Sequence, residues 1–513
     1  MRNSIFMGLA TSLALVLVLL LGACREDFDY APSSGNLRFS KDTVFLDTIF
    51  TTIGSSTYTL KVYNPSDQDI LIPYVGLQNG QASSYRLNVD GIAGKEFADI
   101  PLLAKDSLFV FVETTFDIST TSANEFLYTE DLFFGNGSSA QKVALVTLVR
   151  DAVFLFPATR SNGSKETVVL GTDAQGNQIE VPGFVLDPDQ LDFTNEKPYV
   201  IYGYAVVPEG NTLSMAAGTR VHFHNNSGLV VNAGGSLQVN GQLSEDPELL
   251  EHEVVFEGDR LEPTYADEPG QWGAVWIQKG SVDNQIDHLT IKNATVALRV
   301  DGEAPWNAPS LIVRNTQLYN SLNSNLWATS AHVVAENTVV GSAGNAALLV
   351  ELGGSYQFTH CTFANYWNNG FRSGPAVLLS NSDGVGSADL INAEFVNCII
   401  AGSSSRELSL QSAIESVFDF RFQNCLLQFE DGDNQFAEDP LYDFDDTARY
   451  QNMLLSEDPE FLQPFQNQFQ IGIGSAAIDA AESNIPNPIF LDILGNDRTQ
   501  NPDIGAYEFV PEN

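Results

Sequence analysis

Two patterns of apolar and polar positions divide the chain after its first 36 residues. From residue 37 to residue 155, apolar and polar residues alternate in short runs such as Tyr58–Tyr63 and Leu108–Val112, and turn residues such as Asp90-Gly91 separate the runs. A period of two places successive side chains on opposite faces of a strand, and runs at this spacing are typical of a sandwich of about seven strands. The pattern predicts a β-sandwich over residues 37–155.

The second pattern is a repeat between residues 287 and 429. Its unit begins with Asn or His, continues with Cys, Thr or Leu and then any residue, and ends with an aliphatic residue or Phe. The unit recurs at intervals of about 20 to 40 residues, a period typical of solenoids in which each copy stacks on the previous one. β-Branched residues and Phe alternate inside the copies, which favours strands over helices. The repeat predicts a right-handed parallel β-helix over residues 198–430, with three strands in each coil.

The first residue of each copy marks the same bend of the coil. Asn tolerates the left-handed backbone conformation, and its side chain hydrogen-bonds to nearby backbone groups. Because stacked coils lie about 4.8 Å apart, we expect the first residues to form a structural ladder along the solenoid. These residues are His288, Asn315, Asn337, His360, Asn397 and Asn424.

Several segments resemble parts of known proteins. Gln271–Ile277 resembles a coil strand of bacterial β-helix proteins, and Tyr85–Gly91 resembles immunoglobulin-like modules of bacterial surface proteins. Asp492–Arg498 and Pro502–Glu508 resemble the C-terminal region of bacterial surface β-helix proteins, where such residues close the solenoid. The resemblance implies an all-β chain with an N-terminal immunoglobulin-like β-sandwich, a linker over residues 156–197, the right-handed parallel β-helix, and a C-terminal cap region over residues 431–513.

The N-terminus resembles a bacterial lipoprotein signal. Arg2 precedes an apolar run from Ile5 to Leu21, and Leu21-Gly22-Ala23-Cys24 resembles the lipobox. This resemblance implies a signal peptide over residues 1–23, lipidation of Cys24 and a tether over residues 24–36. The acidic residues directly after Cys24 resemble the surface-export signal of Bacteroidota lipoproteins, which implies a lipid anchor in the outer membrane and exposure on the cell surface. An ordinary signal peptide and an uncleaved anchor are the alternatives.

The charge of the chain limits its partners. Lys and Arg number 24 and Asp and Glu number 65, which gives a formal net charge of −41. A chain without a basic stripe cannot neutralise phosphates, so a general nucleic-acid binder is excluded. The acidic surface repels free polyanions. Neutral glycans, or acidic glycans bridged by calcium, are therefore the polymers that such a surface would accept.

The tryptophans are the candidate ligand contacts. All five fall inside the predicted solenoid, and Trp306, Trp327 and Trp367 lie in polar, Asn-rich surroundings. Aromatic rings in such loops offer stacking platforms for sugar rings, whereas partly buried loop anchors are the alternative. The spacing predicts that Trp306 and Trp327 occupy nearly equivalent points of neighbouring coils.

No residue pattern identifies a catalytic group or a metal site. Cys361, Cys398 and Cys425 share one position of successive copies and are expected to stack as small buried hydrophobes. His222 and His224 lack a third ligand for zinc in the sequence pattern. Eight acids between Glu430 and Asp446 form either a solvated face or a Ca²⁺ site, and their spacing matches no EF-hand. No other cofactor is predicted.

These observations predict a membrane-anchored, non-catalytic binding or surface-architecture protein, with an extracellular glycan as the expected ligand. The alternative is a carbohydrate-active enzyme, a polysaccharide lyase or a glycoside hydrolase, on the same β-helix. Carboxylates clustered with Lys, Arg or Tyr in one groove would favour the enzyme, because hydrolysis needs a pair of carboxyl groups. An aromatic strip without such a cluster would favour binding.

Overall fold

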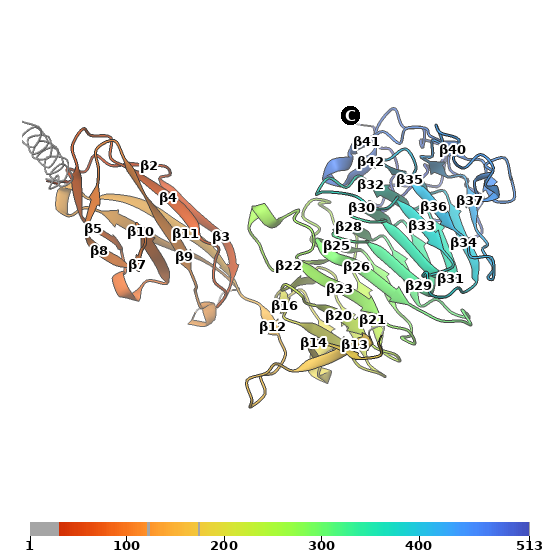
Figure 1. Cartoon of the computed structure of the whole chain (residues 1–513), viewed down its shortest axis with the longest axis horizontal. Helices are drawn as coiled ribbons and strands as arrows, with labels where there is room; N and C mark the ends of the chain where they lie inside the picture. Colours follow the sequence, from red (N-terminus) through yellow and green to blue (C-terminus); the bar gives the residue numbers. More distant parts are fainter. Residues whose placement is uncertain (1–29, 121–123, 173–174, 512–513) are drawn as a thin grey trace, which may run out of the picture. The chain divides into compact units, whose positions relative to one another are not determined.

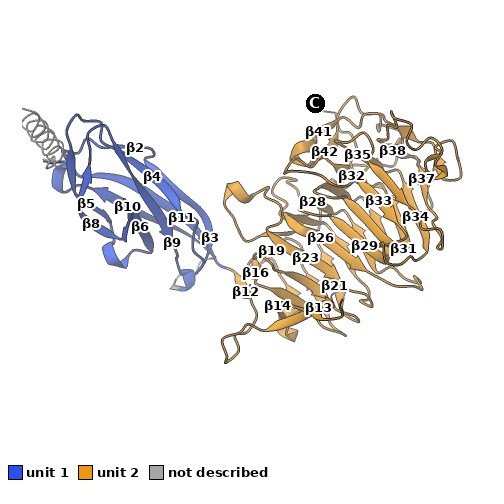
Figure 2. Cartoon of the chain, in the orientation of Figure 1, with its two compact units in different colours: residues 1–151 blue, residues 152–513 orange. Residues whose placement is uncertain are grey.

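The computed structural model describes residues 30–120, 124–172 and 175–511. The chain divides into two units, Met1–Asp151 and Ala152–Asn513, which Figure 2 colours separately. Cys24 and the predicted signal peptide lie outside the described residues. Among the described residues, no helix is long and apolar enough to cross a membrane.

The first unit is a β-sandwich, as the alternating pattern predicts. Its two sheets have six and five strands among the described residues, and the inward residues of both sheets form one core that includes Val44, Leu60, Tyr85 and Val110. The strand count exceeds the prediction because short strands such as β1, β2 and β7 lie at the sheet edges. The six-stranded sheet contains β1 (Ala31–Pro32), β3 (Thr43–Phe50), β5 (Ile70–Leu77), β8 (Glu96–Leu102), β10 (Glu125–Phe134) and β11 (Gln141–Arg150), and the five-stranded sheet contains β2 (Arg38–Phe39), β4 (Tyr58–Tyr63), β6 (Tyr85–Val89), β7 (Ile92–Gly94) and β9 (Ser107–Thr114).

The second unit consists of two large, mostly parallel sheets that the chain visits in rounds of three strand positions, although β29 (Leu326–Glu336) and β31 (Leu348–Thr359) each span the second and third positions of their round. Strands β19 (Arg220–Phe223), β20 (Gly228–Val231) and β21 (Ser236–Asn240) are followed by β22 (Val254–Gly258), β23 (Trp272–Ile277) and β24 (Gln285–Asp287). Each of the latter three pairs in parallel with the strand three places earlier. We call one such round a coil. The first strands of the coils form an 11-stranded sheet, and the second and third strands join in an 18-stranded sheet. Figure 1 shows the strands following one another along the unit in sequence order.

The strands of the second unit have the following bounds. The 11-stranded sheet contains β12 (Val153–Leu155), β16 (Tyr199–Ile201), β19 (Arg220–Phe223), β22 (Val254–Gly258), β25 (Leu289–Lys292), β28 (Gln317–Ser321), β30 (Val339–Ala343), β32 (Thr362–Asn365), β35 (Ile399–Gly402), β38 (Leu426–Leu427) and β40 (Leu454–Leu455). The 18-stranded sheet contains β13 (Thr167–Thr172), β14 (Gln178–Val185), β15 (Asp192–Phe193), β17 (Tyr204–Val207), β18 (Thr212–Met215), β20 (Gly228–Val231), β21 (Ser236–Asn240), β23 (Trp272–Ile277), β24 (Gln285–Asp287), β26 (Ala294–Asp301), β27 (Leu311–Arg314), β29 (Leu326–Glu336), β31 (Leu348–Thr359), β33 (Val377–Ser380), β34 (Leu390–Val396), β36 (Leu408–Gln411), β37 (Arg421–Gln423) and β39 (Tyr450–Gln451). A hairpin of β41 (Phe461–Gln463) and β42 (Gln468–Ile471) follows.

One apolar core runs between the two parallel sheets. Inward residues in register stack on each other along it. Phe358, Phe395, Phe422 and Tyr450 follow one another with ring centroids 4.8, 4.7 and 5.7 Å apart, close to the spacing of neighbouring strands. Stacked aromatic rings keep the coils in register, because a slip of one residue would turn each ring out of the core.

Three domain boundaries differ from those expected. The segment over residues 156–197 is not a plain linker: β14 and β15 pair with β17 and β18, so it forms part of the sheet. At the other end the coils continue past residue 430, because β39 and β40 pair with β37 and β38. Strand β12, placed at the end of the sandwich by the sequence, pairs with β16 and belongs to the second unit.

The predicted cap region divides into two parts with different roles. The residues that close the last coil come first in the chain: Phe429, Phe436, Tyr442 and Phe444 pack together against the end of the core. The rest, residues 461–509, which we call the C-terminal segment, lies along the outer face of the 11-stranded sheet. There it covers outward residues of β30, β32, β35 and β38. The expectation that the whole region closes the end of the coils is therefore corrected.

Candidate functional site

The six predicted ladder residues lie at one bend, just before strands of the 11-stranded sheet. Their φ angles are all positive, between 46° and 54°. Two neighbouring pairs contact each other: Asn337 Nδ2 donates to Asn315 Oδ1 at 3.1 Å, and the Asn397 amide lies 3.0 Å from His360 Nε2. Asn452, one coil after Asn424, has the same conformation, with φ 52°. The bend thus positions every coil from β25 onward in the same way.

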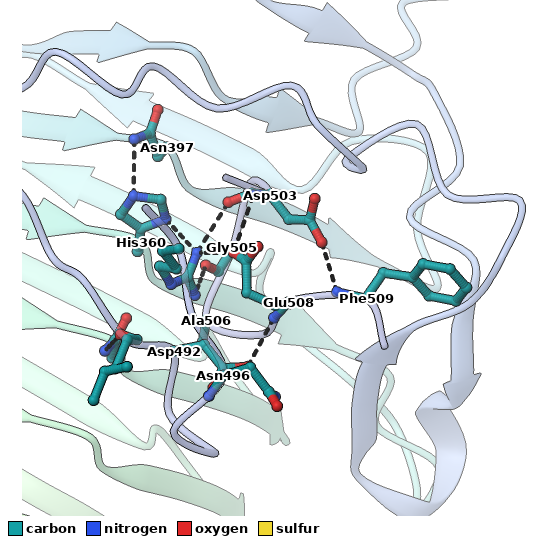
Figure 3. Close-up of polar contacts among 12 residues, drawn as sticks. His360, Asn397, Asp492, Asn496, Asp503, Gly505, Ala506, Glu508 and Phe509 are labelled. Atoms are coloured by element: carbon teal, nitrogen blue, oxygen red, sulfur yellow. Dashed lines mark hydrogen bonds and ion pairs between the residues drawn. The ribbon is translucent and has the colours of Figure 1, made fainter. Parts of the chain in front are cut away.

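His360 connects this bend to the C-terminal segment (Figure 3). Its Nδ1 lies 2.7 Å from Arg498 Nη1, and Arg498 also pairs with Glu508 at 2.7 Å. Because the guanidinium is always protonated, Nδ1 of His360 accepts a hydrogen bond from Arg498. Burial, together with the Arg498 charge, lowers the pKa of His360 well below its usual value. This network holds the C-terminal segment in place.

The exposed chemistry of the second unit centres on three residues on neighbouring strands. Trp276 pairs in register with Arg299, and Arg299 pairs with Trp327. The guanidinium carbon lies 4.1 Å from the Trp276 ring centroid and 5.0 Å from the Trp327 ring centroid. All three side chains point away from the core and remain partly exposed. We call Trp276, Arg299 and Trp327 the aromatic strip.

Two carboxylates hold the aromatic strip in place. Trp276 Nε1 donates to Asp301 Oδ2 at 2.8 Å, and Arg299 Nε donates to Asp301 Oδ1 at 3.2 Å. Trp327 Nε1 donates to Glu351 Oε2 at 2.9 Å. Charge-assisted bonds of this kind are stronger than neutral ones, and the guanidinium adds a cation–π contact on each side. The rings are therefore fixed before any ligand arrives.

The row that contains the aromatic strip leads to a cavity. Trp327 pairs with Leu349, Leu349 with Leu378, and Leu378 with Ser409. Ser409 lines a cavity of about 510 Å³, whose other lining residues include Ser404, Arg406, Gln411, Gln435 and Phe436. Hydroxyl, amide and guanidinium groups beside the rings of Phe436 and Tyr442 provide the hydrogen-bonding groups that a small polar ligand requires.

Arg372, which also lines this cavity, belongs to a buried ion pair. Arg372 Nη2 lies 2.8 Å from Glu407 Oε1, and the Glu407 side chain is fully buried. Burial raises the pKa of Glu407, although Arg372 opposes the shift. Glu407 also accepts from the backbone N–H groups of Ser404 and Ala376. With all these partners, Glu407 shapes the cavity rather than facing a ligand as a free acid.

The other predicted platform residues do not join the aromatic strip. Trp306 lies in the loop between β26 and β27, and its Nε1 donates to the Ser330 carbonyl at 2.8 Å. It therefore does not occupy a position equivalent to that of Trp327; Trp276 does. Trp367 is only 7% exposed, which makes it a buried anchor rather than a platform. Its surroundings overturn the expectation from sequence, because polar neighbours in the chain do not imply an exposed ring.

Among the described residues, no group of three or more His, Cys, Asp and Glu side chains is placed to hold a metal ion. The acids after residue 430 bond locally: Asp431 and Asp433 contact Arg406, and Asp439 caps a short 3-10 turn. The Ca²⁺ expectation receives no support from this geometry and stays a prediction. Cys361, Cys398 and Cys425 are buried and free, and burial raises the pKa of Cys398 well above its usual value.

Sequence reasoning missed Trp276 as a member of the site, and it missed Arg299, Asp301 and Glu351 altogether. The available signal is the strand alternation in Trp272–Ile277 and Ala294–Asp301, which puts Trp276, Arg299 and Asp301 on outward positions. Finding the strip also requires the pairing between coils. That pairing depends on loop lengths between strands, which the Asn and His markers do not specify.

Comparison with known proteins gives distant matches. No family model matches the chain, and no curated protein matches it. The catalytic unit of a thermostable GH87 α-1,3-glucanase from Streptomyces thermodiastaticus is 11% identical, over 72% of this chain and 79% of that one, with a TM-score of 0.21. The Agl-KA catalytic domain is 10% identical, over 72% and 81%, with a TM-score of 0.16. The ASH/PapD-like domain 7 of human CEP192 is 9% identical, over 25% and 92%, with a TM-score of 0.16. At these TM-scores the likeness carries no argument about the site, which rests on the chain's own residues.

Proposed function

We propose that this chain is a glycan-binding lipoprotein, anchored in the outer membrane of a Bacteroidota-like bacterium through lipid on Cys24 and exposed on the cell surface. In this proposal residues 152–513 are a right-handed parallel β-helix, and the sandwich is a spacer between anchor and ligand. The observation that carries the proposal is the aromatic strip, in which two indoles lie on either side of a guanidinium. The three residues stand on strands that pair in register, β23, β26 and β29.

The aromatic strip has the two kinds of surface that sugars require. A pyranose presents apolar C–H groups and a rim of hydroxyls. The indoles of Trp276 and Trp327 offer apolar contact to the C–H groups. Arg299 offers a hydrogen-bond donor and Asp301 an acceptor to the hydroxyls. Both side chains remain partly exposed, Arg299 at 31% and Asp301 at 19%. Asp301 and Glu351 each hold an indole N–H, so the strip itself has no free acid–base pair and acts without catalysis.

The direction of the row suits a polymer. Register partners follow the stacking direction of the coils at about 4.8 Å per strand, so an extended glycan lying along the row meets a new side chain at regular intervals. The strip would hold two or three sugar rings, and the cavity lined by Ser409 and Gln411 would receive the end of the chain or a branch. The net charge of −41 favours a neutral glycan over a free polyanion.

The experiment is binding of a neutral oligosaccharide, selected on a glycan array, to wild type, Trp276→Ala and Trp327→Ala. Each substitution should weaken binding about five-fold, or roughly 1 kcal/mol, because one aromatic contact is lost. Thermal unfolding is followed in parallel. Trp306→Ala is the matched control, because that indole lies in a loop outside the strip, and it should bind as wild type does.

Two results would contradict the proposal. Wild-type affinity in both strip variants would mean that the rings do not contact the glycan. Affinity that falls only together with the melting temperature would mean that the rings are packing residues.

A further inference from the structure

Four side chains form a row at the bend directly after the first strands of the 11-stranded sheet. Strands β12, β16, β19 and β22 are neighbours in that sheet (Figure 1), with Leu155 paired with Ile201 and Ile201 paired with Phe223. The register continues one residue further, because the Tyr202 N–H donates to the Leu155 carbonyl at 2.9 Å. The residues that follow these strands therefore occupy equivalent positions in successive rounds: Phe156, Tyr202, His224 and Asp259. We call these four residues the post-strand row.

Neighbouring members of the post-strand row hold one another in place. The ring centroids of Tyr202 and His224 lie 4.4 Å apart, and His224 Nδ1 lies 2.7 Å from Asp259 Oδ2. An ionised carboxylate only accepts hydrogen bonds, so Nδ1 is the donor and Nε2 is the ring atom left for a ligand. The hydrogen bond to Asp259 raises the pKa of His224, although burial opposes the shift. The His224 side chain is 48% exposed, so its outer edge is accessible.

The post-strand row borders a cavity of about 500 Å³, which Phe156, Tyr202 and His224 help to line. All the residues that line it belong to the second unit. Its volume lies within the range of small-molecule sites, about 300–1,000 Å³. Pro157 and Pro182 add apolar surface, and Phe156 is 60% exposed. The cavity therefore offers mainly apolar contact, including ring faces against which a flat ligand can stack.

The charged groups at this cavity are of one sign. Lys165 and His224 line it, and its lining includes no Asp or Glu among the described residues, although 65 of the 513 residues of the chain are acidic. Lys165 Nζ donates to Thr159 Oγ1 at 2.9 Å, and within the described ranges it has no ion-pair partner. An ammonium without a carboxylate, close to an imidazole that Asp259 holds, favours a negative group on the ligand.

We propose that this cavity binds a small aromatic carboxylate. The ligand ring lies against Phe156 and Tyr202, and its carboxylate accepts hydrogen bonds from His224 Nε2 and from Lys165 Nζ. A sugar acid has the same charge, but its ring hydroxyls would face apolar groups and lose their hydrogen bonds to water, which costs free energy. An aromatic ring has no such cost. Asp259 is a positioning residue, because it orients the imidazole and stabilises its protonated form.

This inference goes beyond the proposed function and does not depend on the aromatic strip, which lies in the 18-stranded sheet. The test is titration calorimetry on the full chain in a non-ionic detergent, with the same detergent without protein as the blank. Benzoate, 4-hydroxybenzoate and 2-naphthoate are the aromatic carboxylates. Benzyl alcohol has a ring without charge, acetate has the charge without a ring, and glucuronate is the sugar acid. At least one aromatic carboxylate should bind about ten-fold more tightly than each of these three.

Three substitutions locate the site. His224→Gln and Lys165→Met should each weaken binding of the tightest aromatic carboxylate about ten-fold, because each removes a charged donor. Phe156→Ala should weaken it about three-fold, because one ring contact is lost. All three residues are exposed, so the melting temperature should not change. His252→Gln is the matched control, because this exposed histidine precedes β22, at the opposite end of the strand from the post-strand row, and it should bind as wild type does.

Three results would overturn the inference. They are no saturable binding of any aromatic carboxylate, equally tight binding of benzyl alcohol, acetate or glucuronate, or wild-type affinity in both His224→Gln and Lys165→Met. The neutral oligosaccharide should bind His224→Gln and wild type equally, because that ligand contacts the aromatic strip. Failure to bind the oligosaccharide therefore rejects the proposed function alone, and failure to bind the aromatic carboxylates rejects this inference alone.

Discussion

His360 occupies a ladder position that Asn holds in most other coils, and its ring reaches a partner that an amide does not. Arg498 has a fully buried side chain and would be an unpaired charge without Glu508, the His360 ring and the backbone carbonyls of Asp503 and Gly505. An isolated buried charge costs several kcal/mol. The neutral His360 imidazole accepts a hydrogen bond from the guanidinium and therefore lowers the free-energy cost of burying Arg498.

The pH dependence of folding should report on His360. Its native pKa is depressed, so its contribution to stability is present above the unfolded pKa of about 6.5 and is lost as the pH falls below it. Relative to His360→Asn, wild type should lose stability between pH 6.5 and pH 5, with a slope approaching about 1.4 kcal/mol per pH unit. The measurement is urea unfolding of both proteins across this range.

Glu508 titrates in the opposite sense. Burial raises its pKa to about 7, so its contribution is present at low pH and declines as the pH rises through that value. Because both proteins contain Glu508, the difference between them isolates His360. Parallel stability curves for the two proteins would show that His360 already carries a proton in the native state.

The residues that the sequence identifies well are those whose role is local. A left-handed bend restricts the residue type at its own position, so Asn and His at the start of each repeat suffice to locate the bend. A stacked pair such as Trp276 and Arg299 depends on two strands meeting in register across a loop of unpredictable length. Trp327 could therefore be selected as an exposed aromatic, while its partner could not.

At the scale of the elements, the ladder also docks the C-terminal segment. Asn397 Nδ2 donates to the Glu482 carbonyl at 3.0 Å, and its Oδ1 accepts from Glu482 N–H at 2.8 Å. Asn337 Nδ2 donates to the Leu491 carbonyl at 2.8 Å. Each of these asparagines therefore contributes to two elements. Its backbone forms the bend, and its side chain binds the C-terminal segment.

These two contributions can be separated by substitution at Asn397, whose φ is 54°. Asn397→Gly keeps the bend and loses the side-chain hydrogen bonds, which should cost about 1–3 kcal/mol. Asn397→Ala loses the side-chain hydrogen bonds and also disfavours the left-handed bend, so its free energy of unfolding should be about 1–2 kcal/mol lower still. Chemical denaturation measures the free energies of unfolding. Equal values for Ala and Gly would mean that the bend adjusts to the new residue.

Asn424→Gly is the control for this pair. Among the described residues its amide has a 3.5 Å contact with Asn452 and no hydrogen bond to the C-terminal segment, so glycine at this position should be nearly neutral. A large cost at Asn424 would show that side-chain contacts along the ladder, rather than docking, account for the stability.

The position of the C-terminal segment could have been found from the strands rather than from the segment. Val339-Val340, Ile399-Ile400 and Leu426-Leu427 are apolar at adjacent positions, and a strand that buries both faces has this pattern. In β19 and β25 the outward positions are Arg220, His222, Thr290 and Lys292 instead. The motif order in Asp492–Glu508 identifies a folded element, but it contains no information about which surface the element covers.

At the scale of the whole molecule, the proposed lipid anchor can be tested by a substitution that leaves the fold unchanged. The two units each have their own core, so lipid on Cys24 is not needed for either to fold. Cys24→Ala should move the protein from the membrane fraction to the soluble fraction and abolish labelling by radioactive palmitate, because no acyl chain can attach.

Cys361→Ala is the control for the anchor, since that thiol is fully buried. It should keep both the palmitate label and the membrane location. A Cys24→Ala protein that still fractionates with membranes and still carries the label would exclude a lipid anchor at this residue.

The C-terminal segment that covers β30, β32 and β35 also affects the order in which the protein folds. A chain that is synthesised, or that crosses a membrane, from its N-terminus arrives at a finite rate, about 5–20 residues per second at the ribosome, so the coils emerge before the C-terminal segment that covers them. During those seconds Val339, Ala364 and Ile399 form an uncovered apolar stripe, although Ile493, Ile504 and Ala506 will bury it later. The nascent protein therefore passes through a stage that needs protection from aggregation, and the duration of that stage is fixed by the length of chain between the coils and their cover.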